Sequence, residues 1–378
     1  MPIGEDSDNN TTDIKVQAPE NNGYSKINTL NQFKINSKGL SYIEVGTFPL
    51  LNEISSTNTA GTYSLVINYD TSTDTKGITS ITFNGVNCYN ATNKDGPLYV
   101  SLKHGNEEFP KRLGFILVGG GGGSGGGGRY DPDKDKKNSH GDFIIPGGGG
   151  GGGEIVYGVL DISYEAAQKL QNNTSPKSLT YKIKVGSGGN AGDHNISNGA
   201  SSGGHDGGTG ASGEDSIISV QKSSSKYEEF VRACGGFGGG GATSFTLGTG
   251  GAGGSYSNSR NIASIASNYN CIITGAIKGG RGGHPASQTS VENESLSFSI
   301  HFSNTKPPVN YMISRSYSAS SKTYSTDENT DAAVFQTPGG HSFGSGAMLN
   351  SAATEGGGGG CFASSNRGGA SGYFGIYY

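Results

Sequence analysis

The chain has 378 residues, a formal net charge of −4 and 68 glycines, roughly 18% against about 7% in average proteins. Charged residues make up 15% of it, hydrophobic residues make up 31%, and tryptophan is absent. Because glycine destabilises helices and strands and little apolar surface is available for burial, this composition excludes a large helical bundle and an ordinary doubly wound α/β enzyme. The acidic balance, without a dense stripe of lysine and arginine, argues against a nucleic-acid partner.

Residues 1–39 are rich in asparagine, aspartate, serine and threonine, which predicts a polar N-terminal arm or attachment segment. Their acidic character is the opposite of a signal peptide, so we expect any role outside the cell to involve a non-secretory route. The longest apolar run, at 115–118, falls far short of the roughly 18 residues that a membrane span needs. We therefore expect no membrane insertion.

Residues 40–118 predict a small antiparallel β module. Strand alternation over 63–69 places Tyr63, Leu65, Ile67 and Tyr69 on one face. Three further strand-like runs, each bounded by turn residues, lie at 77–83, 97–102 and 113–118. Four strands joined by short turns predict an antiparallel sheet or a small sandwich.

Residues 119–378 alternate glycine clusters with short β-like pieces. The clusters lie at 119–128, 147–153, 186–192, 203–213, 235–241, 248–254, 279–283, 339–346, 356–360 and 368–372. The β-like pieces lie at 154–160, 180–185, 216–220 and 373–378, and a serine-capped helix is predicted over 163–170. A glycine-poor insertion at about 285–338 contains a strand-like run at 296–302.

The glycine clusters allow two interpretations, flexible linkers or an ordered bundle. Collagen is excluded because glycine does not recur strictly at every third residue with proline partners. In a polyglycine type II helix, with three residues per turn and about 3.1 Å rise, every backbone N–H and C=O points outward to neighbouring chains. The similar lengths of the clusters, their alternation with apolar strands and the alanines and serines within them favour the bundle. The predicted fold is therefore mainly β with stacked polyglycine type II helices.

The order of these pieces resembles a known family. Phe115-Ile116-Leu117-Val118 leads into 119–128, Pro146 and 147–153 lead into Glu154-Ile155-Val156, and 368–372 leads into Tyr373-Phe374-Gly375-Ile376-Tyr377-Tyr378. This series is similar to the glycine-rich domain of bacteriophage tail-fibre and tail-tip adhesins, over roughly residues 110–378. The resemblance implies a stacked sandwich of type II helices whose variable loops at one end touch receptors on the bacterial surface.

Motifs that would indicate catalysis or metal binding are weak. Gly340-His341-Ser342-Phe343-Gly344 matches the G-x-S-x-G nucleophile elbow, but without a preceding strand or a following helix we interpret it as a chance match. Asp131, Asp133 and Asp135 copy part of a calcium-loop spacing, but Lys136 stands where that loop needs glycine, so a solvated turn is favoured. The histidines form no metal-ligand cluster, so we expect no metal and no cofactor.

The four cysteines lie far apart and form no C-x-x-C pair, so we predict reduced, largely buried thiols. They are Cys88, Cys234, Cys271 and Cys361.

The predicted function is that of a virion structural protein, most simply a phage tail-fibre adhesin without catalysis. Its partners would be other virion proteins at the N-terminal region and a bacterial receptor, either carbohydrate or outer-membrane protein, with a homotrimer as the candidate assembly. The first alternative is a head fibre, capsid decoration or tail structural component without receptor binding. The others are a surface-polysaccharide depolymerase and a cellular surface protein with a glycine-rich ectodomain. Tyrosines and arginines of the polar loops are the predicted receptor-binding residues: Arg129, Tyr130, Tyr256, Arg260, Tyr269, Tyr311, Arg315, Tyr317 and Tyr324.

Overall fold

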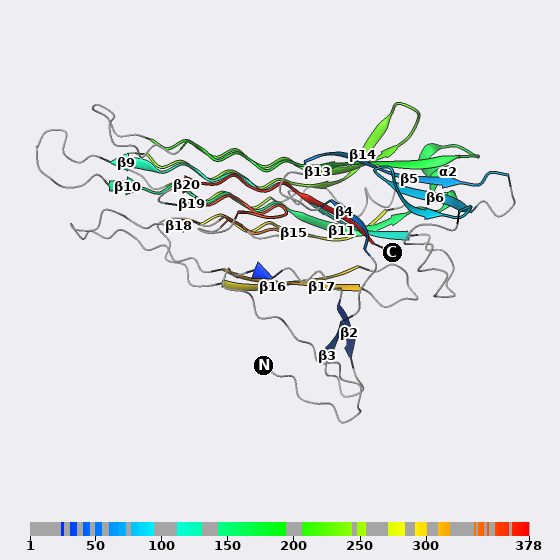
Figure 1. Ribbon diagram of the computed structural model, residues 1–378, viewed down its shortest axis with the longest axis horizontal. Helices are drawn as coiled ribbons and strands as arrows, with labels where there is room; N and C mark the ends of the chain where they lie inside the picture. The colour runs from blue at the N-terminus through cyan, green and yellow to red at the C-terminus, as the bar shows by residue number, and fades with distance from the viewer. Residues whose placement is uncertain are drawn as a thin grey trace, which may run out of the picture.

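The computed structural model describes the sheets and most of the glycine-rich segments (Figure 1). The described residues are 24–25, 31–35, 41–45, 50–54, 60–72, 77–93, 112–130, 143–193, 206–243, 248–254, 271–283, 292–300, 309–317, 336–337, 339–343, 346–347, 352–362 and 365–377. All four cysteines fall within them and are free, and three are buried, which confirms the predicted thiols.

Two antiparallel sheets make the chain mainly β, as predicted, and their strands lie mostly to the right in Figure 1. The first sheet has the order β15-β11-β8-β21-β4, with bounds Cys271–Ile277, Ile155–Asp161, Arg112–Val118, Tyr373–Tyr377 and Leu50–Ile54. The second has the order β14-β13-β12-β5-β6-β7, with bounds Tyr227–Ala233, Ser216–Gln221, Ser178–Val185, Gly61–Tyr69, Ile78–Phe83 and Val86–Asn90.

The strands predicted within 40–118 do not form a sheet of their own, which corrects that part of the prediction. β5, β6 and β8 confirm the strands predicted near 63–69, 77–83 and 113–118, whereas 97–102 lies outside the described residues. β5 pairs on one side with β6 and on the other with β12, while β8 lies between β11 and β21. The physical reason is that a long strand needs a partner on each edge, and the later strands supply the second one.

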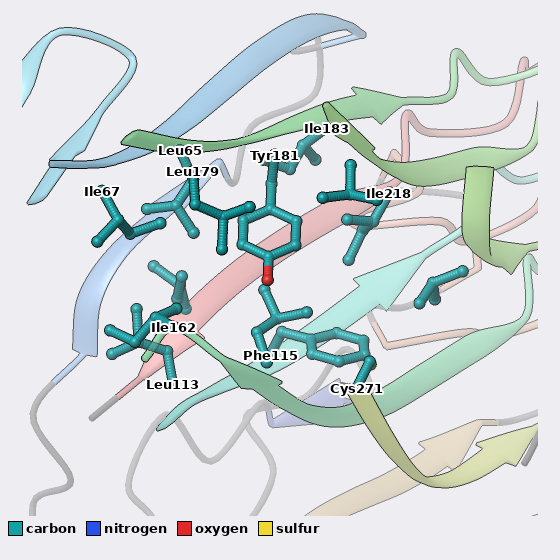
Figure 2. Packing of buried hydrophobic residues seen from close by; sticks show 14 of the residues in the cluster. Leu65, Ile67, Leu113, Phe115, Ile162, Leu179, Tyr181, Ile183, Ile218 and Cys271 are labelled. Carbon is teal, nitrogen blue, oxygen red and sulfur yellow. The ribbon is translucent and has the colours of Figure 1, made fainter. Parts of the chain in front are cut away.

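One hydrophobic core fills the space between the two sheets. Figure 2 shows Tyr181 reaching from the second sheet toward Phe115 of the first, among aliphatic side chains from both. The Tyr181 hydroxyl crosses the core and donates to the Asp161 carbonyl at 3.1 Å. The rings of Phe83 and Phe374, again from opposite sheets, stack with centroids 5.7 Å apart. At about 2–3 kcal/mol for each large side chain removed from water, this core holds the sheets together.

β8 is buried on both faces because a second, smaller cluster covers its other side. Leu113, Phe115 and Leu117 point into the main core, whereas Ile116 and Val118 join the second cluster. Alternation along the strand therefore separates two apolar layers, which accounts for the continuous apolar sequence of β8. The ring of Phe343 stacks on Tyr373 in this cluster, with centroids 4.6 Å apart.

A short helix joins the two sheets. α2 spans Tyr164–Gln171, which confirms the predicted serine-capped helix, and the Ser163 side chain accepts from the N–H of Ala166 at 3.2 Å. It ends at Asn172, whose left-handed conformation (φ 49°) is one that asparagine tolerates. Leu170 on its buried face packs into the main core. The helix connects β11 of the first sheet to β12 of the second.

Ten extended glycine-rich runs leave the sheets side by side (Figure 1). We number them run 1 (119–127), run 2 (146–154), run 3 (186–193), run 4 (206–215), run 5 (234–243), run 6 (248–254), run 7 (278–283), run 8 (339–343), run 9 (356–360) and run 10 (366–372). Their backbone hydrogen bonds show that odd-numbered runs lead away from the sheets and even-numbered runs return.

Run 1 is hydrogen-bonded to six neighbouring runs. Its N–H groups donate in turn to runs 2, 4 and 10, so that residues 119, 122 and 125 all bond to run 2 while 120, 123 and 126 all bond to run 4. Its carbonyls accept from runs 3, 5 and 9, and these donor–acceptor distances lie between 2.7 and 3.1 Å. Backbone hydrogen bonds therefore replace side-chain packing around this run.

Run 2 likewise has six neighbours, namely runs 1, 5, 6, 7, 8 and 9. The other eight runs close a ring around this central pair. Each pair of neighbouring runs in this ring is joined by at least one backbone hydrogen bond. Written with the N–H donor first and the carbonyl acceptor second, these are Glu214 to Ser187, Gly213 to Gly236, Phe237 to Ala252, Gly279 to Gly254, Gly280 to His341, Gly358 to Gly340, Ala370 to Gly357 and Gly369 to Gly189.

Most inner positions of the runs have no room for a side chain, although run 1 also holds the buried Ser124. A Cβ added to Gly121 would lie 1.9 Å from the Gly357 carbonyl oxygen, and one added to Gly150 would lie 2.0 Å from the Gly122 oxygen. Both distances are far inside van der Waals contact, and the obstacle in each case is backbone that is itself hydrogen-bonded to neighbouring runs. Only glycine is compatible with the spacing at these two positions, and similar contacts at the other inner glycines account for the composition of the chain.

The N-terminal segment and the insertion share a third sheet. β17 (Val309–Tyr317) pairs with β16 (Glu292–Ile300) on one edge and with β1 (Tyr24–Ser25) and β2 (Asn31–Ile35) on the other, and β3 (Ser41–Val45) pairs with β2. The strand predicted at 296–302 is thus confirmed with bounds shifted toward the N-terminus. Part of the predicted polar arm is β-structured, because the insertion gives it an edge to pair with.

Candidate functional site

The far end of the glycine runs, opposite the two sheets, is the first candidate surface. Short antiparallel strands lie there, namely β9 (Gly128–Tyr130) with β10 (Phe143–Ile145), and β19 (Cys361–Phe362) with β18 (Gln336–Thr337) and β20 (Ser365–Asn366). They bridge an outgoing run and the run that returns beside it. The connection between central runs 1 and 2 therefore leaves from the middle of this end, and the other connections leave from the ring.

Side-chain hydrogen bonds fasten this end to the runs. The Thr337 hydroxyl lies 2.9 Å from the carbonyl oxygens of both Gly147 and Cys361, and the Asn366 side-chain amide donates to the Gly192 carbonyl. Ser124, a buried residue of run 1, accepts from the Arg367 N–H at 3.2 Å. Polar side chains thus fix connections that would otherwise leave backbone groups unpaired.

Two of the predicted receptor-binding residues lie at this far end. Arg129 and Tyr130 stand in β9, opposite Ile144 and Phe143 of β10. They directly follow run 1, which is hydrogen-bonded to six other runs, so their backbone continues from a firmly held segment. Asp131, Asp133 and Asp135, which come next in the chain, lie outside the described residues.

The other predicted residues are placed elsewhere or are not described. Tyr256, Arg260, Tyr269 and Tyr324 lie outside the described residues. Gly254 and Cys271 are the described residues that flank Tyr256, Arg260 and Tyr269 in the sequence. Both lie at the end of the runs next to the sheets, because the Gly254 N–H donates to the Gly152 carbonyl and Cys271 pairs with Leu160 of β11.

Tyr311, Arg315 and Tyr317 stand on β17, which corrects the expectation that this segment is a loop. Arg315 is opposite Tyr24 of β1, and Tyr311 is opposite Phe298 of β16. β17 has partners on both edges, which stabilises a strand in a polar sequence with weak alternation. Figure 1 shows β17 well separated from β9, so the structure does not bring these residues together with Arg129 and Tyr130.

The G-x-S-x-G segment has no nucleophile-elbow geometry in its described part. Ser342 is fully buried beside run 2, where its hydroxyl donates to the Gly153 carbonyl at 2.6 Å, and His341 is buried next to it. Within the described residues, no three histidine, cysteine, aspartate or glutamate side chains gather as metal ligands. No helix in that same part of the chain is long and apolar enough to cross a membrane.

A charged network where β14 passes into run 5 was not predicted from the sequence. Arg232 contacts the Glu229 carboxylate at 2.7 Å and pairs with Asp215, and both carboxylates raise the pKa of the guanidinium. The second Asp215 oxygen accepts from the Gly235 N–H at 2.9 Å, and buried Glu154 accepts from the Cys234 N–H at 3.0 Å. These carboxylates satisfy the N–H groups at the start of run 5.

The same junction changes the acidity of a thiol. Burial, together with the negative charges of Asp215 and Glu154, raises the pKa of Cys234 to about 12. The thiol therefore stays protonated at neutral pH, so it is a poor nucleophile. The junction fastens the sheets to the runs and carries no reactive group of its own.

No protein-family model matches the chain, and no curated protein sequence is similar to it.

Proposed function

We propose that the ten runs are polyglycine type II helices packed side by side into a rigid slab. Support comes from the threefold repeat of partners along run 1, since a helix with three residues per turn directs every third N–H to the same neighbour. The six neighbours of runs 1 and 2 and the absence of space for a Cβ agree with this packing.

The function that this geometry favours is that of a virion structural protein, specifically a phage tail-fibre adhesin that presents loops for host attachment. One observation carries the proposal. Outgoing and returning runs alternate around the slab, so the chain between each outgoing run and its successor begins and ends at the end remote from the sheets. A rigid support that repeatedly exposes variable segments at one end suits recognition better than catalysis.

In this proposal the protein is not an enzyme and needs no cofactor. The N-terminal region, with the third sheet, would contact other virion proteins, and the far end, with Arg129 and Tyr130, would face a bacterial carbohydrate or outer-membrane protein. A head fibre or capsid decoration would use the same slab without a receptor. A polysaccharide depolymerase would need a pair of carboxylates about 5–9.5 Å apart in a cleft.

Immunogold electron microscopy of purified particles, with antibody raised against residues 285–338, tests the proposal. Label at the distal tips of fibres supports an adhesin. Label on the head or tail shaft contradicts the adhesin and favours the structural alternative. Absence of label on every particle, when the protein is detected in cells, overturns the virion assignment.

A further inference from the structure

The flank of the slab carries one prominent aromatic side chain. Phe237 lies in run 5, on the face formed by runs 4, 5 and 6, and is 57% exposed. In the described part of the chain the other exposed large hydrophobic residues are Val86, at the start of β7, and Tyr227, at the start of β14. Phe237 is therefore the one large apolar group on a described surface made mostly of glycine, alanine, serine and threonine.

The backbone beneath Phe237 is held on two sides. Its N–H donates to the Ala252 carbonyl in run 6 at 2.9 Å, and its carbonyl accepts from Gly151 in central run 2 at 2.8 Å. The preceding residue, Gly236, donates to Gly120 of run 1 at 2.8 Å. The ring thus stands on a base that loses little freedom when a ligand binds, which reduces the entropic cost of binding.

Open polar groups flank the aromatic residue on the same run. The carbonyls of Gly235 and Gly238, one on each side, accept no hydrogen bond from the described part of the chain. Exposed Ser212 of run 4 lies beside them, because its Oγ is 3.4 Å from the Gly238 N–H. Alanines 211 and 252 are the exposed apolar neighbours and add little height to the surface.

We propose that this face binds carbohydrate, with a neutral sugar ring stacked on Phe237 and its hydroxyls donating to the carbonyls of Gly235 and Gly238. A sugar offers both a flat C–H face for an aromatic ring and hydroxyl donors for open acceptors. A protein partner is less suited, because the core of a protein interface joins several large apolar groups and this face has one. The site is separate from the far end and does not depend on the chain being part of a virion.

A printed array of bacterial and neutral glycans, probed with the purified full-length chain and with Phe237→Ala, tests the site. We expect Phe237→Ala to lower binding to at least one neutral glycan tenfold or more, while Phe237→Trp keeps it within about threefold because a ring remains. Val86→Ala is the matched control, since it removes a similarly exposed apolar side chain from β7 in the second sheet.

Three outcomes would overturn the proposal. The first is an array without any signal that depends on Phe237, and the second is a signal confined to anionic glycans and abolished by salt. The third is a change in sedimentation coefficient in Phe237→Ala, which would assign the ring to a contact between copies. A loss of glycan binding counts for the site only if Phe237→Ala unfolds at the same temperature as the wild type. The immunogold labelling of particles tests the virion proposal separately, so either proposal can fail without the other.

Discussion

The two halves of this protein satisfy the same backbone groups in different ways. In the two main sheets a strand has at most two hydrogen-bonded neighbours, and its side chains, such as those of β8, build apolar layers above and below it. In the glycine-rich half, runs 1 and 2 each have six neighbours, and space for a Cβ is absent at inner glycines such as Gly121 and Gly150. Burial of side chains therefore stabilises one half, and saturation of the backbone stabilises the other.

The clearest way to break this comparison is to add one carbon to a central run. Gly121→Ala places a Cβ 1.9 Å from the Gly357 oxygen, so we expect a loss above about 4 kcal/mol and an insoluble or unfolded protein. Gly77→Ala is the control, because a Cβ there has nothing within 4 Å. Soluble expression and thermal unfolding are the measurements, and wild-type stability of Gly121→Ala would contradict the packing described for run 1.

The corresponding change in the sheets removes atoms instead of adding them. Phe115 is fully buried between the sheets, so Phe115→Ala is expected to lower the free energy of unfolding by about 3–5 kcal/mol through lost burial and a cavity. Urea unfolding measures the change, with exposed Val86→Ala as the control. A loss below 1 kcal/mol would mean that the core does not hold the sheets together.

The junction between the halves is tested by Ser216, the buried first residue of β13. Its Oγ donates to the Val118 carbonyl at 2.6 Å and accepts from the Gly186 N–H at 2.9 Å, linking β8 and run 3. Ser216→Ala leaves both backbone groups without these partners, so we expect a loss of about 2–4 kcal/mol in urea unfolding. Ser219→Ala, three residues along the same strand, should change stability by less than about 1 kcal/mol.

The smallest effect is a dependence on alkaline pH at the far end. Burial raises the pKa of Cys361 from 9.0 to about 11. Because the folded pKa exceeds the unfolded one, the unfolded chain loses this proton first. The contribution of this thiol to the free energy of unfolding is therefore fully present below pH 9. It is lost between about pH 9 and 11, by at most about 1.4 kcal/mol per pH unit.

Urea unfolding of the wild type and of Cys361→Ala across pH 8–11 measures this contribution. The variant should have a lower baseline stability but a shallower decline with pH. Equal slopes in the two proteins would show that the Cys361 thiol is not protected in the folded state.

Elements with strong local signals were predictable. β5, β8 and β12 alternate or run apolar without interruption, and Ser163 marks the start of α2. β14 and β15 were missed, since three of the seven residues of β14 are charged and β15 contains Gly275. Both are strands because β13 and β11 offer them edges. The capping carboxylates Asp215 and Glu154 were missed for a similar reason, as their partners are distant in the sequence.

By itself the sequence determined that the chain is mainly β, that its cysteines are free thiols and that its glycine clusters alternate with strands. It determined these because composition, side-chain period and cysteine spacing are local properties. Only the tertiary structure decided that β5 and β8 belong to different sheets, that runs 1 and 2 are central and that Arg129 and Tyr311 lie far apart. Those results depend on which backbone groups find one another across long separations, and a glycine cluster carries no side chain that could specify its partner.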